Sequence, residues 1–351
     1  MSLVSRAEQM RGVSVVDVTV VVPTHNRRQL VAQAIHSILQ QKDVSLELVV
    51  VDDGSTDGTA PWLDRISATD SRIKIVHHER PRFISSARNA GIARASGRWI
   101  AFCDDDDLWA PDKLSSQLAA LRASSARWSC TGVVAVDEQL EIIGHHHVGG
   151  GEVLARLLEV NTIPTGSSVI AELSLVREIG GFDPTLRGSE DWDVWIKLGQ
   201  HSPLAAVDRP LIAYRLSAHS LSMDVDRMRT GRAIIVDRYA ALAARHGARP
   251  DKASHERYLA EQLLRGRSRL QAATIFTSLA FRHRRWRELP RAAAAFVAPR
   301  LTGRIGRSRA AAEVPVAWRC EAEAWIQPIR AAYDTEVRRP YVGAKVEALG
   351  A

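Results

Sequence analysis

The sequence predicts an α/β protein: a mixed sheet flanked by helices and followed by a helical C-terminal extension. Between residues 18 and 103, apolar β-branched runs of strand length alternate with segments whose apolar residues recur at helical spacing. From about residue 225 the pattern is helical throughout. At 351 residues, the chain is long enough for one large domain and an appendage. We therefore expect an extension at 1–15, an α/β domain at 16–224 and a basic helical region at 225–351.

The first elements form a βαβ unit. Two buried parallel strands are predicted at Val18–Val22 and Leu46–Val51, because both are continuous apolar runs that end in turn residues. Apolar residues at helical spacing between Leu30 and Leu39 predict the connecting helix. The alternation continues with a strand, a helix and a strand at Arg72–Val76, Ile84–Ala95 and Arg98–Cys103.

The second half of the domain is predicted to be more antiparallel. A helix at Lys113–Arg122 precedes strands at Trp128–Val136, Glu141–Ile143 and Val169–Ala171. A further helix is expected after Ser189, a residue type that often caps a helix N-terminus. Three consecutive histidines, His145 to His147, adjoin three glycines, and we expect an exposed loop there instead of a metal site.

Polar clusters follow three of the predicted parallel strands, at Pro23–Asn26, Asp52–Asp57 and Asp104–Asp107. Ligands of open α/β sheets bind beyond the carboxyl ends of the strands, so one site can collect all three clusters. The four consecutive carboxylates of Asp104–Asp107 would repel one another unless a cation compensates them. Oxygen ligands of this kind suit Mg²⁺ or Mn²⁺. The alternative is a solvated acidic turn before a helix that starts at Pro111 and Asp112.

Charge is distributed unevenly along the chain. The net charge is +7, with 22 basic and 28 acidic residues before position 225 and 25 basic and 12 acidic residues after it. The basic half could favour anionic partners, or it could reflect a composition bias without function. The stretch Phe281–Pro299 mixes five arginines with Trp286, Leu289, Phe296 and Val297. This basic amphipathic stretch either lies on an acidic membrane surface or packs on the domain with a solvated arginine face.

Cysteine usage and hydropathy suggest a cytoplasmic protein. The three cysteines are far apart and form no CxxC pair, which argues against a zinc knuckle or a disulfide framework. No signal peptide or spanning helix is predicted. We expect a cytoplasmic location, with peripheral attachment at the inner face of the cell membrane as an option, and no nucleic-acid partner.

The motifs resemble one known family, the family 2 glycosyltransferases, which are inverting enzymes with the nucleotide-sugar-binding GT-A fold. The matching pieces are, in chain order, Val20-Val-Val-Pro-Thr-His-Asn26, Val50-Val-Asp-Asp-Gly-Ser-Thr-Asp-Gly-Thr59, Ser86-Ala-Arg-Asn-Ala-Gly91, Asp104–Asp107, Ile179-Gly-Gly-Phe-Asp183 and Glu190-Asp-Trp-Asp193. Each piece alone is weak, whereas the ordered set over residues 16–222 is highly specific. Beyond residue 225 the resemblance says little.

The resemblance implies a nucleotide site at the first two strand ends. Pro23, His25 and Asp53 are implied as contacts to the nucleobase, and Arg88 as a contact to the base or a phosphate. A purely structural role would instead have Asp53 cap the turn at Gly54, a task we expect of Asp52.

The resemblance also implies a metal site. Asp104 or Asp105 would face the ribose and Asp106 would be the main ligand of Mn²⁺ or Mg²⁺, although four consecutive aspartates leave the register open. Asp107 would support the metal site or cap the next helix. His219 is a further candidate ligand of metal or phosphate.

Inversion requires a base opposite the leaving group. The resemblance assigns this role to Asp191, with Glu190 and Asp193 as acceptor-side neighbours that position the acceptor or raise the pKa of the base. The alternative is a set of helix N-terminal carboxylates that complement the helix dipole.

The predicted function is transfer of a sugar from a nucleotide diphosphate, with UDP or dTDP favoured, to a hydroxyl of a glycan or lipid-linked acceptor. Two alternatives remain: a nucleotidyltransferase of nucleotide-sugar synthesis, and a non-catalytic nucleotide- or glycan-binding subunit. The first lacks its Gly-rich, Lys-bearing loop, and the second would not need the acidic clusters. A dehydrogenase is disfavoured because no GxGxxG motif follows either early strand.

Overall fold

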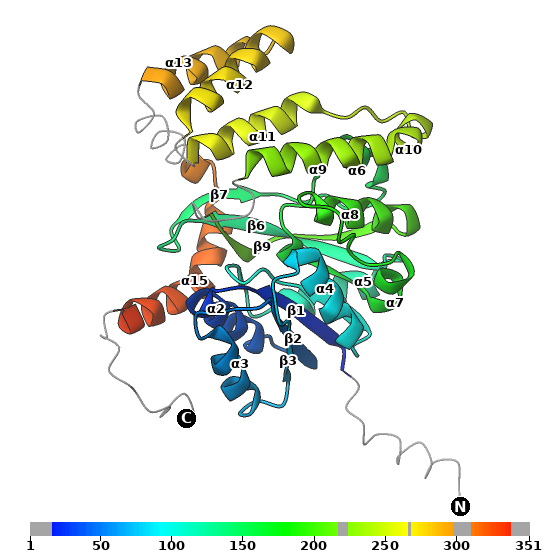
Figure 1. The fold of residues 1–351 in the computed structure, drawn as a ribbon, viewed down its shortest axis with the longest axis vertical. Coiled ribbons are helices and arrows are strands. Elements are labelled where there is room, and N and C mark those ends of the chain that lie inside the picture. Colours follow the sequence, from blue (N-terminus) through cyan, green and yellow to red (C-terminus); the bar gives the residue numbers. More distant parts are fainter. Residues whose placement is uncertain (1–15, 217–223, 266–267, 298–309, 338–351) are drawn as a thin grey trace, which may run out of the picture.

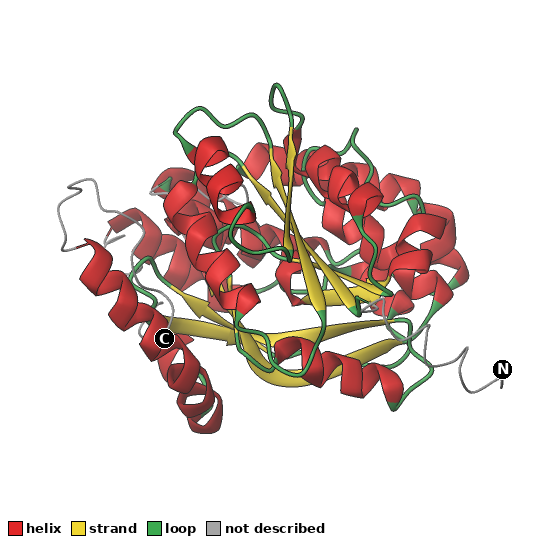
Figure 2. Ribbon diagram, turned by 90° about the horizontal axis from the view of Figure 1, so that it is seen from below, coloured by secondary structure: helices red, strands yellow, loops and turns green. Residues whose placement is uncertain are grey.

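The computed structural model describes residues 16–216, 224–265, 268–297 and 310–337, in which a mixed sheet lies between two layers of helices (Figures 1 and 2). The strands are β1 (Val18–Thr24), β2 (Leu46–Asp52), β3 (Ile73–His77), β4 (Trp99–Phe102), β5 (Leu108–Trp109), β6 (Trp128–Val136), β7 (Ile142–His146), β8 (Val169–Glu172) and β9 (Leu204–Arg215). Their order is β3-β2-β1-β4-β8-β6-β9-β5, with β7 beside β6.

The parallel half of the sheet creates the site edge. In β1 and β2 every residue is buried, as expected of apolar strands covered on both faces. Thr24 pairs in register with Asp52, and Val21 pairs with Phe102 of β4. Because these strands run in the same direction, the polar residues after β1, β2 and β4 meet at one edge.

Seven helices cover this sheet within residues 16–216: α2 (Arg28–Leu39), α3 (Thr59–Ser67), α4 (Phe83–Arg94), α5 (Lys113–Arg122), α6 (Leu154–Glu159), α7 (Leu173–Glu178) and α8 (Glu190–His201). Alternate residues of β1 face opposite layers, because the side chains of a strand repeat every two residues. Val21 packs in the cluster that includes α4, α6, α7 and α8. Val20 and Val22 pack in the cluster that includes α2, α3 and α5.

Gly91 sets how closely α4 approaches the sheet. A Cβ atom at this position would lie 2.3 Å from Cγ1 of Val21, so only glycine permits this contact. The close approach fixes Arg88, one turn earlier on α4, beside the site edge. Asn89 secures the helix from the other side, since its side chain exchanges two hydrogen bonds with the backbone of Phe182, at 2.7 and 2.9 Å.

The C-terminal region is helical, as predicted, with α9 (Val225–Arg238), α10 (Ala240–Arg245), α11 (Lys252–Arg265), α12 (Arg269–Arg282), α13 (Leu289–Val297) and α15 (Val316–Val337). Figure 1 shows α9 to α13 stacked at one end of the molecule, while α15 returns to the sheet. Trp318, Ala322 and Ile326 of α15 share a buried cluster with Val134 and Ala213. The last described helix is therefore part of the cover of the sheet.

The predicted strands and helices of the domain occur within one or two residues of the expected bounds, with two differences. The strand predicted at Glu141–Ile143 extends to His146, so the expected exposed histidine loop is wrong: His145 and His146 belong to β7. His147 lies 2.9 Å from the carboxylate of Asp208. Ser189 stands at the N-cap position of α8, but its φ is +61° and its side chain makes no capping hydrogen bond.

Among the described helices, none is both long and apolar enough to cross a membrane.

Candidate active site

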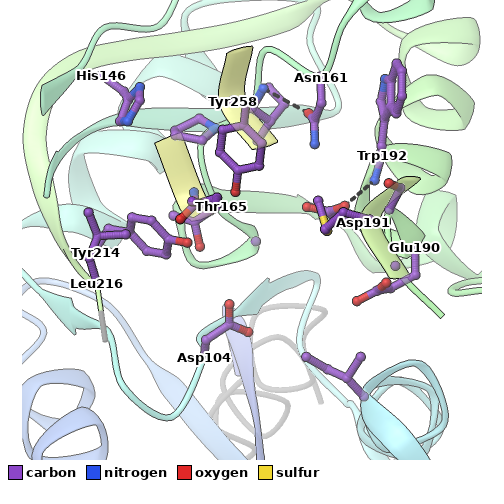
Figure 3. A pocket seen from close by; sticks show the side chains of 18 of the residues that line it. Asp104, His146, Asn161, Thr165, Glu190, Asp191, Trp192, Tyr214, Leu216 and Tyr258 are labelled. Carbon is purple, nitrogen blue, oxygen red and sulfur yellow. Dashed lines mark hydrogen bonds between the residues drawn. The ribbon is translucent and has the colours of Figure 1, made fainter. Parts of the chain in front are cut away.

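A cavity of about 1130 Å³ opens at the carboxyl ends of β1, β2 and β4. Its walls combine residues from the parallel strand ends, the start of α4, the first turn of α8, and helices α9 and α11 of the C-terminal region. Such a volume exceeds the roughly 300–1,000 Å³ of typical small-molecule pockets. In Figure 3 the carboxylate of Asp104 and those of Glu190 and Asp191 face the same space from opposite sides.

The first three carboxylates of the acidic cluster line this cavity. Asp104 accepts a hydrogen bond from a terminal nitrogen of Arg88 at 2.6 Å. Asp105 accepts from the hydroxyl of Thr24 at 2.8 Å and from Arg27 at 2.9 Å, and the same Arg27 nitrogen lies 3.2 Å from Asp106. The sequence prediction did not include Arg27, which holds two of the three carboxylates together.

Crowding perturbs the protonation of the cluster. Burial, with added repulsion from the Asp105 and Asp104 carboxylates, raises the pKa of Asp106 to about 7. Burial also raises the pKa of Asp105, although Arg27 opposes the shift. These side chains therefore supply closely spaced oxygen donors whose negative charge is under-compensated, which is the donor chemistry that a hard divalent cation fits.

Asp107 is a structural residue. Its carboxylate is fully buried and accepts hydrogen bonds from the hydroxyl of Thr165 at 3.2 Å and the backbone N–H of Arg215 at 3.1 Å. It does not line the cavity. Asp107 thus ties the acidic loop to the end of β9, and it does not cap a helix, because α5 begins only at Lys113.

The predicted nucleobase residues Pro23, His25 and Asp53 all line the cavity. Asp53 accepts hydrogen bonds from the backbone N–H groups of Arg82 and Phe83, both at 2.8 Å, and therefore anchors the start of α4. The turn at Gly54 is served by Asp52, which accepts from the N–H of Ser55, whereas the carboxylate of Asp53 bonds the start of α4 and His78. His25 lies 2.8 Å from the carbonyl of Asp53, which links the ends of β1 and β2.

Glu190 and Asp191 begin α8 on the other side of the cavity. Burial, reinforced by the charge of Glu190 and opposed by Arg88, raises the pKa of Asp191 to about 6. The buried guanidinium of Arg88 bonds Asp104 at 2.6 Å and lies 3.8 Å from Glu190. Arg88 therefore bridges the acidic loop and the pair of carboxylates on α8.

The structure corrects the placement of Asp193. Its carboxylate is fully buried and contacts Lys197 at 2.7 Å, Arg238 at 2.9 Å and the hydroxyl of Tyr239 at 2.8 Å. Residues two positions apart on a helix point in nearly opposite directions, so Asp193 faces α9 while Asp191 faces the cavity. Asp193 does not line the cavity and joins two helices instead.

The remaining metal candidate, His219, lies outside the described residues. The preceding Arg215 is described: its Nε donates to the backbone carbonyl of Asp106 at 3.0 Å, and a terminal nitrogen donates to Gln33 at 2.6 Å. Within the described ranges, no three His, Cys, Asp or Glu side chains form a metal-ligating group. Mg²⁺ is often held by only one or two carboxylates, with substrate phosphates and water completing its shell.

Comparison with known proteins identifies the fold and family around this cavity. Residues 19–173 match the family model described as glycosyl transferase family 2. This segment belongs to that family. It contains the ends of β1, β2 and β4, the start of α4 and the acidic loop.

Curated relatives match beyond this segment. An uncharacterized glycosyltransferase of Rickettsia felis is 32% identical over 204 residues, which is 57% of this chain and 33% of that protein. The UDP-Glc:alpha-D-GlcNAc-diphosphoundecaprenol beta-1,3-glucosyltransferase WfgD of Escherichia coli is 28% identical over 210 residues, 58% of this chain and 79% of that protein. The chain thus spans only a third of the length of the Rickettsia relative.

Among solved structures, S. aureus TarS 1-349 in complex with UDP-GlcNAc superposes with a TM-score of 0.50 at 16% identity, covering 93% of each chain. At this identity the similarity concerns the fold, and it confirms the predicted GT-A type of architecture with its helical C-terminal region.

Several residues that line the cavity were not predicted from the sequence. Phe83, which has a φ of +69° and a half-exposed ring, lines the cavity, and the guanidinium of Arg187 stacks on it at 3.4 Å. Arg232 and Tyr258 reach the cavity from the C-terminal region. No local pattern marks them, because they meet the family motifs only through tertiary packing.

Proposed function

We propose that this chain is an inverting glycosyltransferase. It would move a sugar from a nucleotide diphosphate to a hydroxyl of a glycan or lipid-linked acceptor. One observation carries the proposal: a single cavity holds the strand-end residues around Asp53, the acidic loop Asp104–Asp106 and, from the opposite wall, Glu190 and Asp191. A donor and an acceptor would thereby meet between a phosphate-binding side and a base.

The donor would lie along the strand ends. Pro23, His25 and Asp53 line the end of the cavity that would hold the base, and Asp104 and Asp105 would face the ribose. The carboxylate of Asp104 already pairs with the guanidinium of Arg88. Arg88 would therefore orient this carboxylate and contribute only weakly to binding a phosphate. UDP or dTDP is favoured, because a carboxylate such as Asp53 suits the N3–H of a pyrimidine, and WfgD is named for a UDP-Glc donor.

The acidic loop would hold a divalent cation. Asp106, assisted by Asp104 or Asp105, would bind Mn²⁺ or Mg²⁺, with the diphosphate completing the shell. Bound there, the ion supplies stabilisation of the negative charge on the departing diphosphate. The raised pKa of Asp106 supports this role, because a cation would favour its ionised form.

Asp191 would act as the general base. Its carboxylate faces the cavity, and a pKa of about 6 makes it a stronger base than an ordinary aspartate while leaving it ionised at neutral pH. Glu190 contributes to that pKa, and Arg88 keeps it from rising further. The acceptor hydroxyl would lose its proton to Asp191 as it attacks the anomeric carbon.

A direct test uses candidate donors without a known acceptor. Melting temperatures with UDP, dTDP and GDP, each with and without Mn²⁺, report donor binding, because a ligand of the native state raises the melting temperature. Slow hydrolysis of UDP-sugars, lost in Asp191→Asn, would support transferase chemistry. Pyrophosphate release from UTP and a sugar 1-phosphate would favour the nucleotidyltransferase, and binding without any turnover would favour a binding subunit.

We also propose that the C-terminal helices contact an anionic membrane. Phe281 and Trp286 stack edge to face at 5.4 Å, yet their side chains remain 59% and 55% exposed. Arg284 and Arg287 lie beside them and are also exposed. Exposed aromatic rings among arginines are typical of interfacial helices, and a lipid-linked acceptor would be presented at such a surface.

A further inference from the structure

The wall of the cavity around the proposed base carries three arginines. Besides the acidic loop, the cavity is lined by Arg156 from α6 and by Arg227 and Arg232 from α9. Arg156 is paired with Glu159 at 2.7 Å, and the Nε of Arg227 donates to the carbonyl of Arg187. Arg232 differs from both, because the structure gives it neither a hydrogen bond nor an ion pair within the described ranges.

Arg232 is a buried cation with unused donors. Only 7% of its surface is exposed, its guanidinium lies over the ring of Trp192 at 5.7 Å, and its Nη2 is buried without a hydrogen-bond acceptor among the described residues. The carboxylates of Asp251 and Glu256 act on it only at longer range, while burial lowers its pKa. Leaving a buried charged donor unpaired is costly, so such a group indicates a ligand that supplies the acceptor.

A second unpaired polar atom lies on the same wall. His255 of α11 lines the cavity, and its Nε2 is also buried without a partner among the described residues. Burial together with Arg232 and Arg229 lowers the pKa of His255 to about 3, so the ring is neutral and offers one N–H. Glu261, the carboxylate nearest in sequence that lines this wall, is paired with Arg257 at 3.2 Å.

This wall belongs to the acceptor side. Trp192 directly follows Asp191 in α8, and its indole N–H donates to the carbonyl of Leu157, which fixes the ring under Arg232. Figure 3 shows Trp192 and Asp191 on one side of the space and Asp104, from the acidic loop, on the other. An anion bound at Arg232 would therefore lie beside the base and across from the donor diphosphate.

We propose that Arg232 and His255 form a subsite for an anionic group of the acceptor. The group is a sugar carboxylate or a phosphate ester, both of which present oxygen acceptors to the guanidinium fork. Arg232 is then a specificity-determining residue that selects acidic or phosphate-linked glycans. This inference rests on the proposed function, since it assigns a substrate class to the same cavity.

The test measures acceptor-side binding while UDP and Mn²⁺ occupy the donor side. N-acetylglucosamine 1-phosphate, glucuronate and neutral N-acetylglucosamine are titrated by calorimetry or ligand-observed NMR into wild type, Arg232→Gln and Arg229→Gln. Arg229 is the matched control, because it lies on the same helix and shares the long-range charge effect on His255 but does not line the cavity. We expect at least one anionic probe to bind wild type about tenfold more tightly than the neutral sugar. That preference should vanish in Arg232→Gln and persist in Arg229→Gln.

The outcomes are distinguishable. Preference for the phosphate probe identifies a phosphate-linked acceptor, and preference for glucuronate identifies an acidic sugar; either supports the subsite. Equal binding of charged and neutral probes to wild type, or equal losses in both variants, would overturn it. Unchanged UDP affinity in all three proteins separates this result from failure of the proposed function, in which wild type would not bind UDP. If Arg232→Gln does not fold, Arg232→Lys should keep the preference with severalfold weaker binding.

Discussion

The chemistry of the site depends on carboxylates whose neighbours set their protonation. Asp191 is buried beside Glu190, which raises its pKa, while the guanidinium of Arg88 opposes the shift. Asp106 is buried beside Asp105 and Asp104, and Arg27 offsets only part of their repulsion. Two acidic centres with raised pKa values thus face one cavity, a common arrangement in active sites.

Replacing Asp191 should separate donor binding from chemistry. Asp191→Asn preserves the shape of the side chain but cannot accept the proton of the acceptor hydroxyl. We expect turnover to fall by ~10²–10⁴-fold, the usual contribution of a positioned base, with UDP affinity unchanged. Initial rates and calorimetric titration measure the two effects. A parallel loss of UDP affinity would remove Asp191 from the acceptor side.

The pH profile offers an independent check on the same residue. The ionised form of Asp191 is the active base, so kcat/KM should decrease as pH falls through about 6, the raised pKa of this carboxyl. An ordinary aspartate would show this decrease near pH 4. Rates measured between pH 4.5 and 8 locate this decrease of kcat/KM. The residual activity of Asp191→Asn should not show the decrease, and a decrease that persists in the variant would belong to another group.

Asp106→Asn should remove metal dependence without unfolding the protein. Because the pKa of Asp106 is raised in the folded state, its ionisation costs folding free energy at neutral pH, and the amide should leave the ligand-free melting temperature unchanged or higher. We expect Mn²⁺ to enhance UDP affinity in wild type and this enhancement to fall by more than ~10-fold in the variant. Asp226→Asn, at a highly exposed aspartate on α9, is the control. Equal enhancement in both variants would assign the metal to another group.

At the scale of elements, α8 connects the site to the C-terminal helices. Its first turn presents Glu190 and Asp191 to the cavity, whereas Asp193 faces α9 and bonds Arg238 and Tyr239. The helix that carries the proposed base is thus held by the helix that carries Arg232. Placement of the base and of the anion subsite is therefore coupled through the buried carboxylate of Asp193 and the contact of Arg232 with Trp192.

Asp193→Asn should destabilise this junction. Lys197 and Arg238 would lose a buried anionic partner, but both are partly exposed and can be rehydrated, so we expect a loss of about 2–4 kcal/mol in the free energy of unfolding. Urea denaturation measures the change. Asp237→Asn, at an exposed position on α9, should change stability by less than about 0.5 kcal/mol. A neutral effect of Asp193→Asn would show that the junction does not depend on this charge.

At the scale of the whole molecule, charge and exposed aromatic surface concentrate in the C-terminal region. Residues 225–351 carry 25 basic and 12 acidic residues, and Figure 1 places α12 and α13 at the end of the molecule farthest from β3. The exposed Phe281 precedes Arg282, and the exposed Trp286 lies between Arg285 and Arg287. A membrane contact at this end would leave the cavity at the carboxyl ends of β1, β2 and β4 accessible to a nucleotide-sugar donor.

Vesicle binding tests this orientation. Each basic residue near anionic headgroups contributes about 1 kcal/mol, so wild type should co-sediment with anionic vesicles at low salt and dissociate at ~0.5 M, where the Debye length is a few ångströms. Arg284/Arg285/Arg287→Gln should weaken binding at low salt. The control variant, Arg65/Arg94/Arg122→Gln, removes the same charge from exposed positions on the catalytic domain. Equal pelleting with neutral vesicles, or equal effects of the two variants, would leave these helices without a membrane role.

The sequence by itself predicted every described strand except β5 and β9, the helices α2, α4, α5 and α8, the helical C-terminal region, and the sheet edge where the polar strand ends meet. Buried parallel strands such as Val18–Thr24 are continuous apolar runs, and the polar residues at their carboxyl ends must meet at one edge. Only the tertiary structure showed that Asp107 faces inward and that Asp193 bonds Arg238 of α9. It also showed that His145 lies in a strand and that Arg232 lines the cavity. The physical reason is range: strand and helix patterns arise from neighbouring residues, whereas the orientation of a side chain depends on partners far along the chain.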